Sequence, residues 1–118
     1  MSIMPEYDLT PDASRRLAAA YTSLVESELY DGRTVTHFAA ELGVTPGHLS
    51  RACNIACGRS ASAILADRVH FEARRMLAET DLPIKYIAEK LGFHSAAYFS
   101  RAFHKHTGYA PRNFRQNG

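Results

Sequence analysis

The chain has 118 residues, of which 46% are hydrophobic and 22% charged, as in one average globular domain. Two cysteines are too few for a disulfide framework, and no apolar run approaches the roughly 18 residues of a membrane helix. These features exclude a secreted disulfide-rich protein, a transmembrane protein and a multidomain enzyme. We expect a small cytoplasmic module.

The net charge of +2 hides an uneven distribution along the chain. Residues 1–50 carry three basic and seven acidic side chains, whereas residues 51–118 carry eleven basic and five acidic ones. No acidic residue follows Leu91. A one-sided basic field attracts polyanions, most often nucleic acid. A solvated basic face without a partner is the alternative that charge alone leaves open.

The spacing of apolar residues predicts helices throughout the first half. After a leader or linker at residues 1–12, a first helix is expected to begin at Thr10-Pro11 and to stop at Asp31-Gly32. A second is expected from Thr34 to Gly43 and a third from Thr45-Pro46 toward Gly58, each with a capping hydroxyl and a terminal glycine. The expected buried faces comprise Leu17, Tyr21, Leu24, Val25 and Leu29, then Val35, Phe38, Ala39 and Leu42, and then Leu49 and Ala52.

The second half continues the helical pattern. Ser60 precedes the longest predicted helix, Ala61–Glu79, and shorter helices are expected before Gly92, between Ser95 and Gly108, and after Pro111. Their expected inward residues are Ile64, Leu65, Val69, Ala73, Met76 and Leu77, then Ile84, Ile87, Ala88 and Leu91, then either Tyr98 or Phe99 with Ala102 and Phe103, and finally Phe114. No segment alternates as a strand would. The sequence therefore predicts an all-α chain of about seven helices.

Two stretches of the chain repeat one pattern. Val35–Ile64 matches Ile84–Phe114 at an offset of 49 residues and, after one added residue in the second turn, at an offset of 50. The matched pairs are Phe38 and Ile87, Ala39 and Ala88, Leu42 and Leu91, Gly43 and Gly92, Leu49 and Phe99, Ser50 and Ser100, Arg51 and Arg101, Ala52 and Ala102, Cys53 and Phe103, and Gly58 and Gly108.

Each repeat has the layout of a helix-turn-helix motif. Ala39 and Ala88 suit a close helix crossing, and Gly43 and Gly92 suit the left-handed backbone that ends the first helix. A duplicated helical hairpin used only for packing is the simpler alternative. Because both copies share the same alanine, glycine, serine and arginine positions, DNA binding is the favoured hypothesis.

The second repeat carries the most specific segments: Ile87-Ala88-Glu89-Lys90-Leu91-Gly92-Phe93, Tyr98-Phe99-Ser100-Arg101-Ala102-Phe103 and Gly108-Tyr109-Ala110-Pro111. With Leu42-Gly43-Val44 and His48-Leu49-Ser50-Arg51 in the first repeat, these resemble the DNA-binding domain of the AraC/XylS family of bacterial transcription regulators. The resemblance implies two homeodomain-like helix-turn-helix subdomains, at residues 13–59 and 81–118, joined by a linker helix at residues 60–80.

The resemblance also implies partners and a regulatory role. Double-stranded DNA is the expected partner and RNA polymerase a further one, with activation more common in the family than repression. Most relatives carry an additional effector or dimerisation domain, for which this chain has no room. It is therefore expected to be either a stand-alone regulator or a fragment of a longer protein.

A recognition helix reads bases in the major groove with exposed residues of its N-terminal half. The expected base contacts are Gly47, Ser50, Arg51 and Asn54 in the first subdomain, and Ala96, Ala97, Ser100, Arg101 and His104 in the second. Arg51 and Arg101 are expected to contact guanine, although phosphate contact or a salt bridge to a neighbouring helix stays open for each. The expected phosphate contacts are Thr34, Thr45, Pro83, Lys85, Ser95, Lys105, His106, Arg112 and Arg115.

Departures from the family pattern limit what can be inherited. Cys53 stands where an aromatic is usual, Asn54 replaces a common basic residue, and Gly47 and Ala97 offer no reach. The base preference of a relative therefore does not carry over. The long helix, about 28 Å, is comparable to the roughly 34 Å between adjacent major grooves on one DNA face. We expect an asymmetric, directional site bound by a single chain.

Other chemistry has little support in the sequence. His94, His104 and His106 have no carboxylate or cysteine near them in sequence, so they are expected to be solvated or phosphate-facing rather than metal ligands. Cys53 and Cys57 are expected to be reduced thiols within a helix-turn-helix core, Cys53 acting as a small buried hydrophobe. We expect no catalytic residues, metal or cofactor, and no enzymatic activity. A helical protein-interaction module that binds an acidic partner is the remaining alternative.

Overall fold

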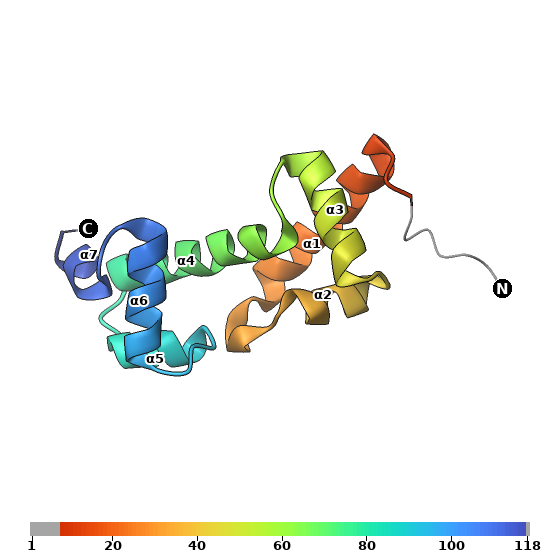
Figure 1. The fold of residues 1–118 in the computed structure, drawn as a ribbon. Coiled ribbons are helices and arrows are strands. Elements are labelled where there is room, and N and C mark those ends of the chain that lie inside the picture. Colours follow the sequence, from red (N-terminus) through yellow and green to blue (C-terminus); the bar gives the residue numbers. More distant parts are fainter. Residues whose placement is uncertain (1–7, 118) are drawn as a thin grey trace. The chain divides into compact units, whose positions relative to one another are not determined.

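The computed structural model describes residues 8–117. Its elements are α1 (Pro11–Glu28), the 3-10 turn η2 (Tyr30–Gly32), α2 (Val35–Leu42), α3 (Pro46–Cys57), α4 (Ala61–Glu79), α5 (Ile84–Lys90), α6 (Ala96–Thr107) and α7 (Pro111–Asn117) (Figure 1). No strand occurs within residues 8–117, which confirms the all-α prediction. No helix among these residues has the length and apolarity needed to cross a membrane.

The predicted caps set the boundaries of three helices. The hydroxyl of Thr34 accepts the backbone N–H of the third residue of α2 at 3.3 Å. Thr45 and Ser95 do the same at the starts of α3 and α6, each at 3.0 Å. Each hydroxyl satisfies one N–H that a helix start leaves without an intrahelical acceptor. These local signals explain why helix starts could be read from the sequence.

Two predicted helix ends differ from the structure. α1 begins at Pro11, as the Thr10-Pro11 start predicted, so residues 11 and 12 of the expected leader belong to the helix; residues 1–7 of the leader lie outside the described residues. α1 ends at Glu28 rather than Asp31-Gly32, since Asp31 adopts a left-handed conformation with φ of 70° in the short turn η2. Similarly, α5 ends at Lys90, and the left-handed glycine, Gly92, follows two residues later.

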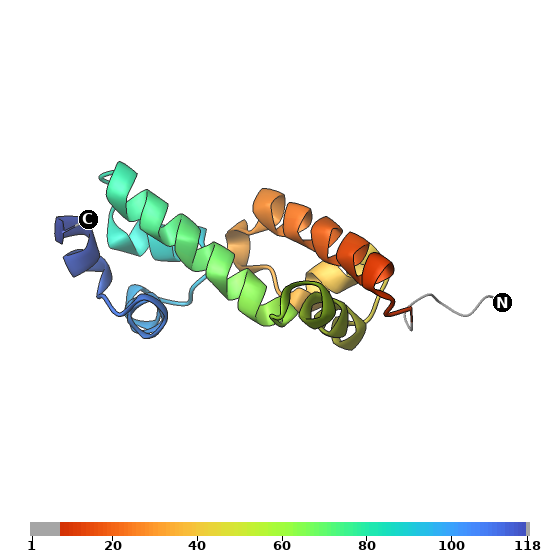
Figure 2. The ribbon, with the colours of Figure 1, turned by 90° about the horizontal axis from the view of Figure 1, so that it is seen from above.

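The described residues form two compact units. The first contains the residues through Glu28 together with Arg33–Ala66, so that α1, α2, α3 and the start of α4 pack together. α1 packs against both α2 and α3 (Figure 2). Tyr21 of α1 is fully buried, contacts Phe38 edge to face, and donates its hydroxyl to the carbonyl oxygen of Ala61 at 2.7 Å. This buried hydrogen bond holds the first turn of α4 against α1.

The second unit comprises Leu29–Gly32 and the residues from Asp67 onward. Its core is aromatic: Phe99 and Phe103 of α6 are fully buried with ring centroids 5.6 Å apart. Phe93 and Phe114 extend this cluster, with centroids 5.1 Å from Phe99 and 5.7 Å from Phe103 respectively. The open choice between Tyr98 and Phe99 is thereby settled, because Tyr98 is 47% exposed.

The two turns share their backbone hydrogen bonds. In the first, Val44 donates to the carbonyl of Ala39 at 3.0 Å; in the second, Phe93 donates to that of Ala88 at 2.9 Å. Gly43 and Gly92 both have positive φ, as predicted. Only Gly92 has a second constraint: a Cβ added there would lie 2.1 Å from the Cα of Gly32 in η2, whereas one added at Gly43 meets nothing within 4 Å.

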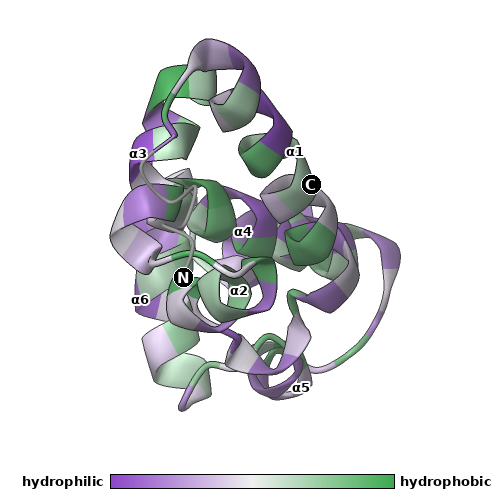
Figure 3. Ribbon diagram, turned by 90° about the vertical axis from the view of Figure 1, so that its right-hand side faces the viewer, coloured by the Kyte–Doolittle hydropathy of each residue, from purple (hydrophilic) through white to green (hydrophobic). Residues whose placement is uncertain are grey.

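The apolar stripe of α4 is less regular than predicted. Ala73, Met76 and Leu77 are buried, but Leu65 and Val69 are only half-buried. Two polar residues, His70 and Glu72, are buried instead. Figure 3 shows hydrophobic and hydrophilic bands alternating along the helices, as expected when each helix buries one face.

Candidate nucleic-acid interface

The exposed face of α3 carries most of the predicted contacts of the first subdomain. Gly47, Arg51 and Asn54 are exposed. A Cβ added at Gly47 would lie 3.3 Å from Nη1 of Arg51, so glycine leaves room for the guanidinium to lie along the first turn of α3. Gly47 has no side chain that could contact a base, but its lack of a Cβ permits this position of Arg51.

Ser50 differs from the other predicted contacts on α3. It is half-buried, and its Oγ accepts the N–H of Ala61 at 3.4 Å. Its backbone carbonyl accepts Nδ2 of Asn54 at 3.1 Å. The hydroxyl of Ser50 is therefore turned toward the start of α4, which sequence spacing alone could not indicate.

On α6, an aromatic residue that the prediction did not include lies beside the predicted arginine. The guanidinium carbon of Arg101 is 6.0 Å from the ring centroid of Tyr98, and the ring of His94 stacks on the same tyrosine at 6.1 Å and 18°. Arg101, Tyr98 and His94 are all exposed. The unresolved choice between Tyr98 and Phe99 was the sequence signal that could have placed an aromatic on this face.

The other predicted base contacts of α6 vary in exposure. Ala97 and His104 are exposed, whereas Ala96 and Ser100 are half-buried. The first turn of α6 leaves the N–H groups of Ala96 and Ala97 without an intrahelical acceptor. Together with the helix dipole, these groups favour an anion at this end of α6.

Two of the predicted phosphate contacts come together near the start of α6. Lys85 of α5 and Ser95 line one open cavity of about 220 Å³, together with His94 and Ala96. Lys105 and Arg112 are exposed on α6 and α7. At Thr34, Thr45 and Ser95 each hydroxyl oxygen accepts a capping hydrogen bond, which leaves its O–H able to donate to a phosphate alongside the helix amides. Pro83, at the start of α5, provides no side-chain cap.

Two predicted phosphate contacts have intramolecular partners. Arg115 donates to the carbonyl oxygens of Leu77 and Thr80 at 3.1 and 3.2 Å, so its guanidinium caps the C-terminal end of α4. His106 lies 3.0 Å from Oδ1 of Asp67. The expectation that no carboxylate lies near these histidines holds only along the sequence, because the fold brings together residues 39 positions apart.

The cysteines divide into two environments. Cys53 is fully buried, as predicted, and burial raises the pKa of its thiol to about 11. Cys57 is exposed at the end of α3, so the expectation that both thiols lie within the core was wrong. Both are free thiols.

Comparison with known proteins places this arrangement in a family. The family model described as a helix-turn-helix domain matches residues 38–117. YtdP, an uncharacterized HTH-type transcriptional regulator of Bacillus subtilis, is 38% identical over 91 residues, and PqrA of Proteus vulgaris, a probable transcription factor, is 34% identical over 88 residues. The arabinose operon regulatory protein of Escherichia coli is 31% identical over 81 residues.

The matches cover 77%, 75% and 69% of this chain respectively. The chain spans 72% of PqrA but only 11% of YtdP and 28% of the arabinose regulator. All three relatives are regulators of transcription, consistent with the expectation that the chain is not an enzyme.

Solved structures share the fold. The C-terminal domain of AraT, a response regulator from Geobacillus stearothermophilus, aligns with a TM-score of 0.80 and 29% identity, over 93% of this chain and 88% of that one. The DNA-binding domain of AdpA, solved in complex with a target DNA, aligns with a TM-score of 0.74 and 22% identity, over 86% and 90%. Taken with the helix-turn-helix geometry, these matches show that the chain belongs to the AraC/XylS family of transcription regulators and is a DNA-binding domain of that family.

Proposed function

We propose that this chain binds a specific, directional DNA site by placing α3 and α6 in major grooves, with Arg51 and Arg101 as the principal base-reading residues. The observation that carries this proposal is the equivalence of the two arginines. They lie 50 residues apart in the repeat, each on the exposed face of an N-capped helix.

The surroundings of the arginines support base contact. Within residues 8–117 neither guanidinium forms an ion pair with a carboxylate, which disfavours the salt-bridge alternative. A guanidinium donates two parallel hydrogen bonds to O6 and N7 of guanine, a contact that discriminates bases by about 1–3 kcal/mol. Gly47 leaves room beside Arg51, whereas the ring of Tyr98 flanks Arg101, so the two guanidinium groups have different surroundings and we expect the two helices to read different base pairs.

Phosphate contacts would fix the orientation on DNA. We assign this role to the N-terminal amides of α3 and α6 and to the exposed cations Lys85, Lys105 and Arg112. The engagement of Arg115 with the end of α4 makes it a structural residue in this proposal. AdpA was solved with its target DNA, which supports duplex DNA as the partner of this related fold.

The regulatory role follows the relatives. We infer that the intact regulator acts in the bacterial cytoplasm as an activator through contact with RNA polymerase, and that a further effector or dimerisation domain belongs to it. The short share of YtdP and of the arabinose regulator that this chain spans supports the further domain.

The test measures affinity for a selected duplex and for a scrambled duplex at two salt concentrations. Arg51→Ala and Arg101→Ala should each reduce the ratio of the two affinities about 5- to 150-fold. Arg16→Ala removes an exposed arginine from α1 and is the matched control, which should leave the ratio unchanged. Binding should weaken with salt by a slope of about 0.9 for each phosphate contact.

Two results would reject the assignment. If R51A and R101A weaken binding equally on both duplexes and reduce the salt slope, the arginines contact phosphate instead. If the parent chain binds the two duplexes equally at high salt and prefers an acidic protein, the chain is an interaction module.

A further inference from the structure

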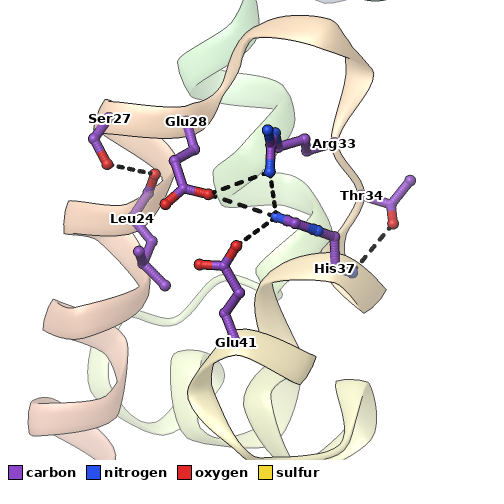
Figure 4. A network of polar contacts seen from close by, with 7 residues as sticks. All are labelled: Leu24, Ser27, Glu28, Arg33, Thr34, His37 and Glu41. Atoms are coloured by element: carbon purple, nitrogen blue, oxygen red, sulfur yellow. Dashed lines mark hydrogen bonds and ion pairs between the residues drawn. The ribbon is translucent and has the colours of Figure 1, made fainter.

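The first unit gathers metal-binding groups away from α3. Nε2 of His37 lies 2.7 Å from Oε2 of Glu41 and 3.5 Å from Oε1 of Glu28. One ligand atom from each residue lies within 4.8 Å of the other two. Glu28 is the last residue of α1, whereas His37 and Glu41 lie one helical turn apart on α2. Figure 4 shows these three side chains pointing toward one another, with Arg33 beside them.

The contacts of His37 conflict with one another. Nε2 also lies 2.8 Å from Nη1 of Arg33, which can only donate a hydrogen bond. If Nε2 carries a proton, it donates to Glu41 but faces the guanidinium donor. If Nε2 carries a lone pair, it accepts from Arg33 but faces a carboxylate oxygen at 2.7 Å. No single protonation state of this nitrogen satisfies both neighbours.

A cation at the centre of the three groups would remove this conflict. A neutral imidazole and two carboxylates each direct an electron pair at the same region, and both kinds of group are common zinc ligands. Metal–ligand bonds of about 2.0–2.2 Å place tetrahedral ligand atoms about 3.4 Å apart. The separations of 2.7 and 3.5 Å between His37 and the two glutamates lie on either side of that value, and the ligand atoms of the two glutamates lie within 4.8 Å of each other.

We propose that Glu28, His37 and Glu41 bind one divalent transition-metal ion of the Zn²⁺ type, with water in the fourth position and the Arg33 guanidinium displaced. About a third of each ligand side chain is exposed, which leaves a path for the ion and for water. Arg33 competes for the site, because its Nη1 lies 2.8 Å from Nε2 of His37 and 3.5 Å from Oε1 of Glu28, two of the proposed ligand atoms.

The bound ion would link the end of α1 to α2. Its ligands lie on both sides of residues 29–32, the segment between α1 and α2 that packs in the second unit. Joining Glu28 to α2 would fix the two ends of this segment within the first unit. The proposal does not depend on DNA binding, so its test needs no DNA.

The test is a titration of the chain with Zn²⁺ at neutral pH, followed by calorimetry, and with Co²⁺, followed by visible absorption. One ion should bind per chain, and the Co²⁺ complex should give the intense bands of four-coordinate geometry. His37→Gln should abolish this binding, and Glu28→Gln or Glu41→Gln should each weaken it about tenfold or more. Arg33→Ala should strengthen it, since the competing cation is removed.

Two control variants address other metal-binding groups. His104→Gln removes an exposed histidine from α6, and Cys57→Ser removes the exposed thiol; both should bind Zn²⁺ as the parent does. Circular dichroism establishes that each variant is folded, and the two glutamate variants decide the matter if His37→Gln unfolds. The proposal is overturned if the parent binds no ion at stoichiometric concentration, or if binding is unchanged in the glutamate variants and in Arg33→Ala.

Discussion

His70 should make the stability of the second unit depend on pH. It is only 6% exposed on α4, between the rings of Phe93 and Phe103 and stacked on His106 at 4.5 Å. Its Nδ1 has no hydrogen-bond partner within residues 8–117. Burial above all, together with the nearby charges of His106 and Arg74 and against the opposing effect of Asp67, lowers the pKa of this imidazole from 6.5 to about 4.

The size of the effect follows from the two pKa values. Because the folded-state pKa lies below the unfolded one, the stabilisation is fully present above pH 6.5 and is lost as the pH falls toward 4. At 1.36 kcal/mol for each unit of difference between the two pKa values, the largest possible loss of folding stability is about 3.4 kcal/mol. The loss at pH 5 is about 2 kcal/mol. The second figure is a large fraction of the stability of a small domain.

The assay is urea unfolding followed by circular dichroism from about pH 7.5 down to about pH 5, for the parent chain and for His70→Leu. Leucine fills a similar volume and does not titrate. The parent should lose about 2 kcal/mol more than the variant over this range. Equal losses in the two proteins would refute the reasoning, because they would show that His70 is protonated equally easily in the folded and unfolded states.

Two further matched pairs test other features of the fold. Gly43→Ala should cost about 1–2 kcal/mol for its positive φ alone, whereas Gly92→Ala should cost at least a further 1–3 kcal/mol because its methyl group overlaps the backbone of η2; equal melting temperatures would contradict that contact. Arg115→Gln should lower thermal stability by about 1 kcal/mol through loss of its bonds to α4 and leave the salt slope of DNA binding unchanged. Arg112→Gln should do the reverse, reducing the salt slope by about 0.9 with little effect on melting.

Helix positions were predictable because local groups determine them. Thr34, Thr45 and Ser95 each cap a helix through a hydrogen bond three residues ahead, and Gly43 and Gly108 adopt the left-handed backbone that ends one. Such signals lie within a few neighbouring residues, so a single sequence displays them. The sequence repeat also predicted that the two turns are equivalent, and the structure shows the same backbone hydrogen bond in each of them.

Contacts between distant segments could not be predicted in this way. The turn η2 lies at the end of α1 in sequence but packs against Gly92, and its φ of 70° at Asp31 is unusual for a residue with a side chain. Arg115 lies 38 residues from the carbonyl of Leu77 that it caps. Composition and spacing therefore indicated cations at these positions but not which of them have partners within the chain.

In the candidate interface, too, some features follow from the local sequence and others from packing between distant residues. The exposure of Arg51 and Arg101 follows from helical periodicity, and their equivalence follows from the repeat. The inward turn of Ser50 toward Ala61 and the place of Tyr98 beside Arg101 depend on packing, which periodicity left open.

Selection of bound duplexes from a random DNA pool, carried out with the parent chain, R51A and R101A, tests most directly whether one chain reads DNA through two unlike helices. The parent should enrich a bipartite, non-palindromic motif whose two parts lie about one helical turn apart. Each variant should lose preference in a different part and keep the other. A palindromic motif bound only by two chains, or the same motif from all three proteins, would contradict the account.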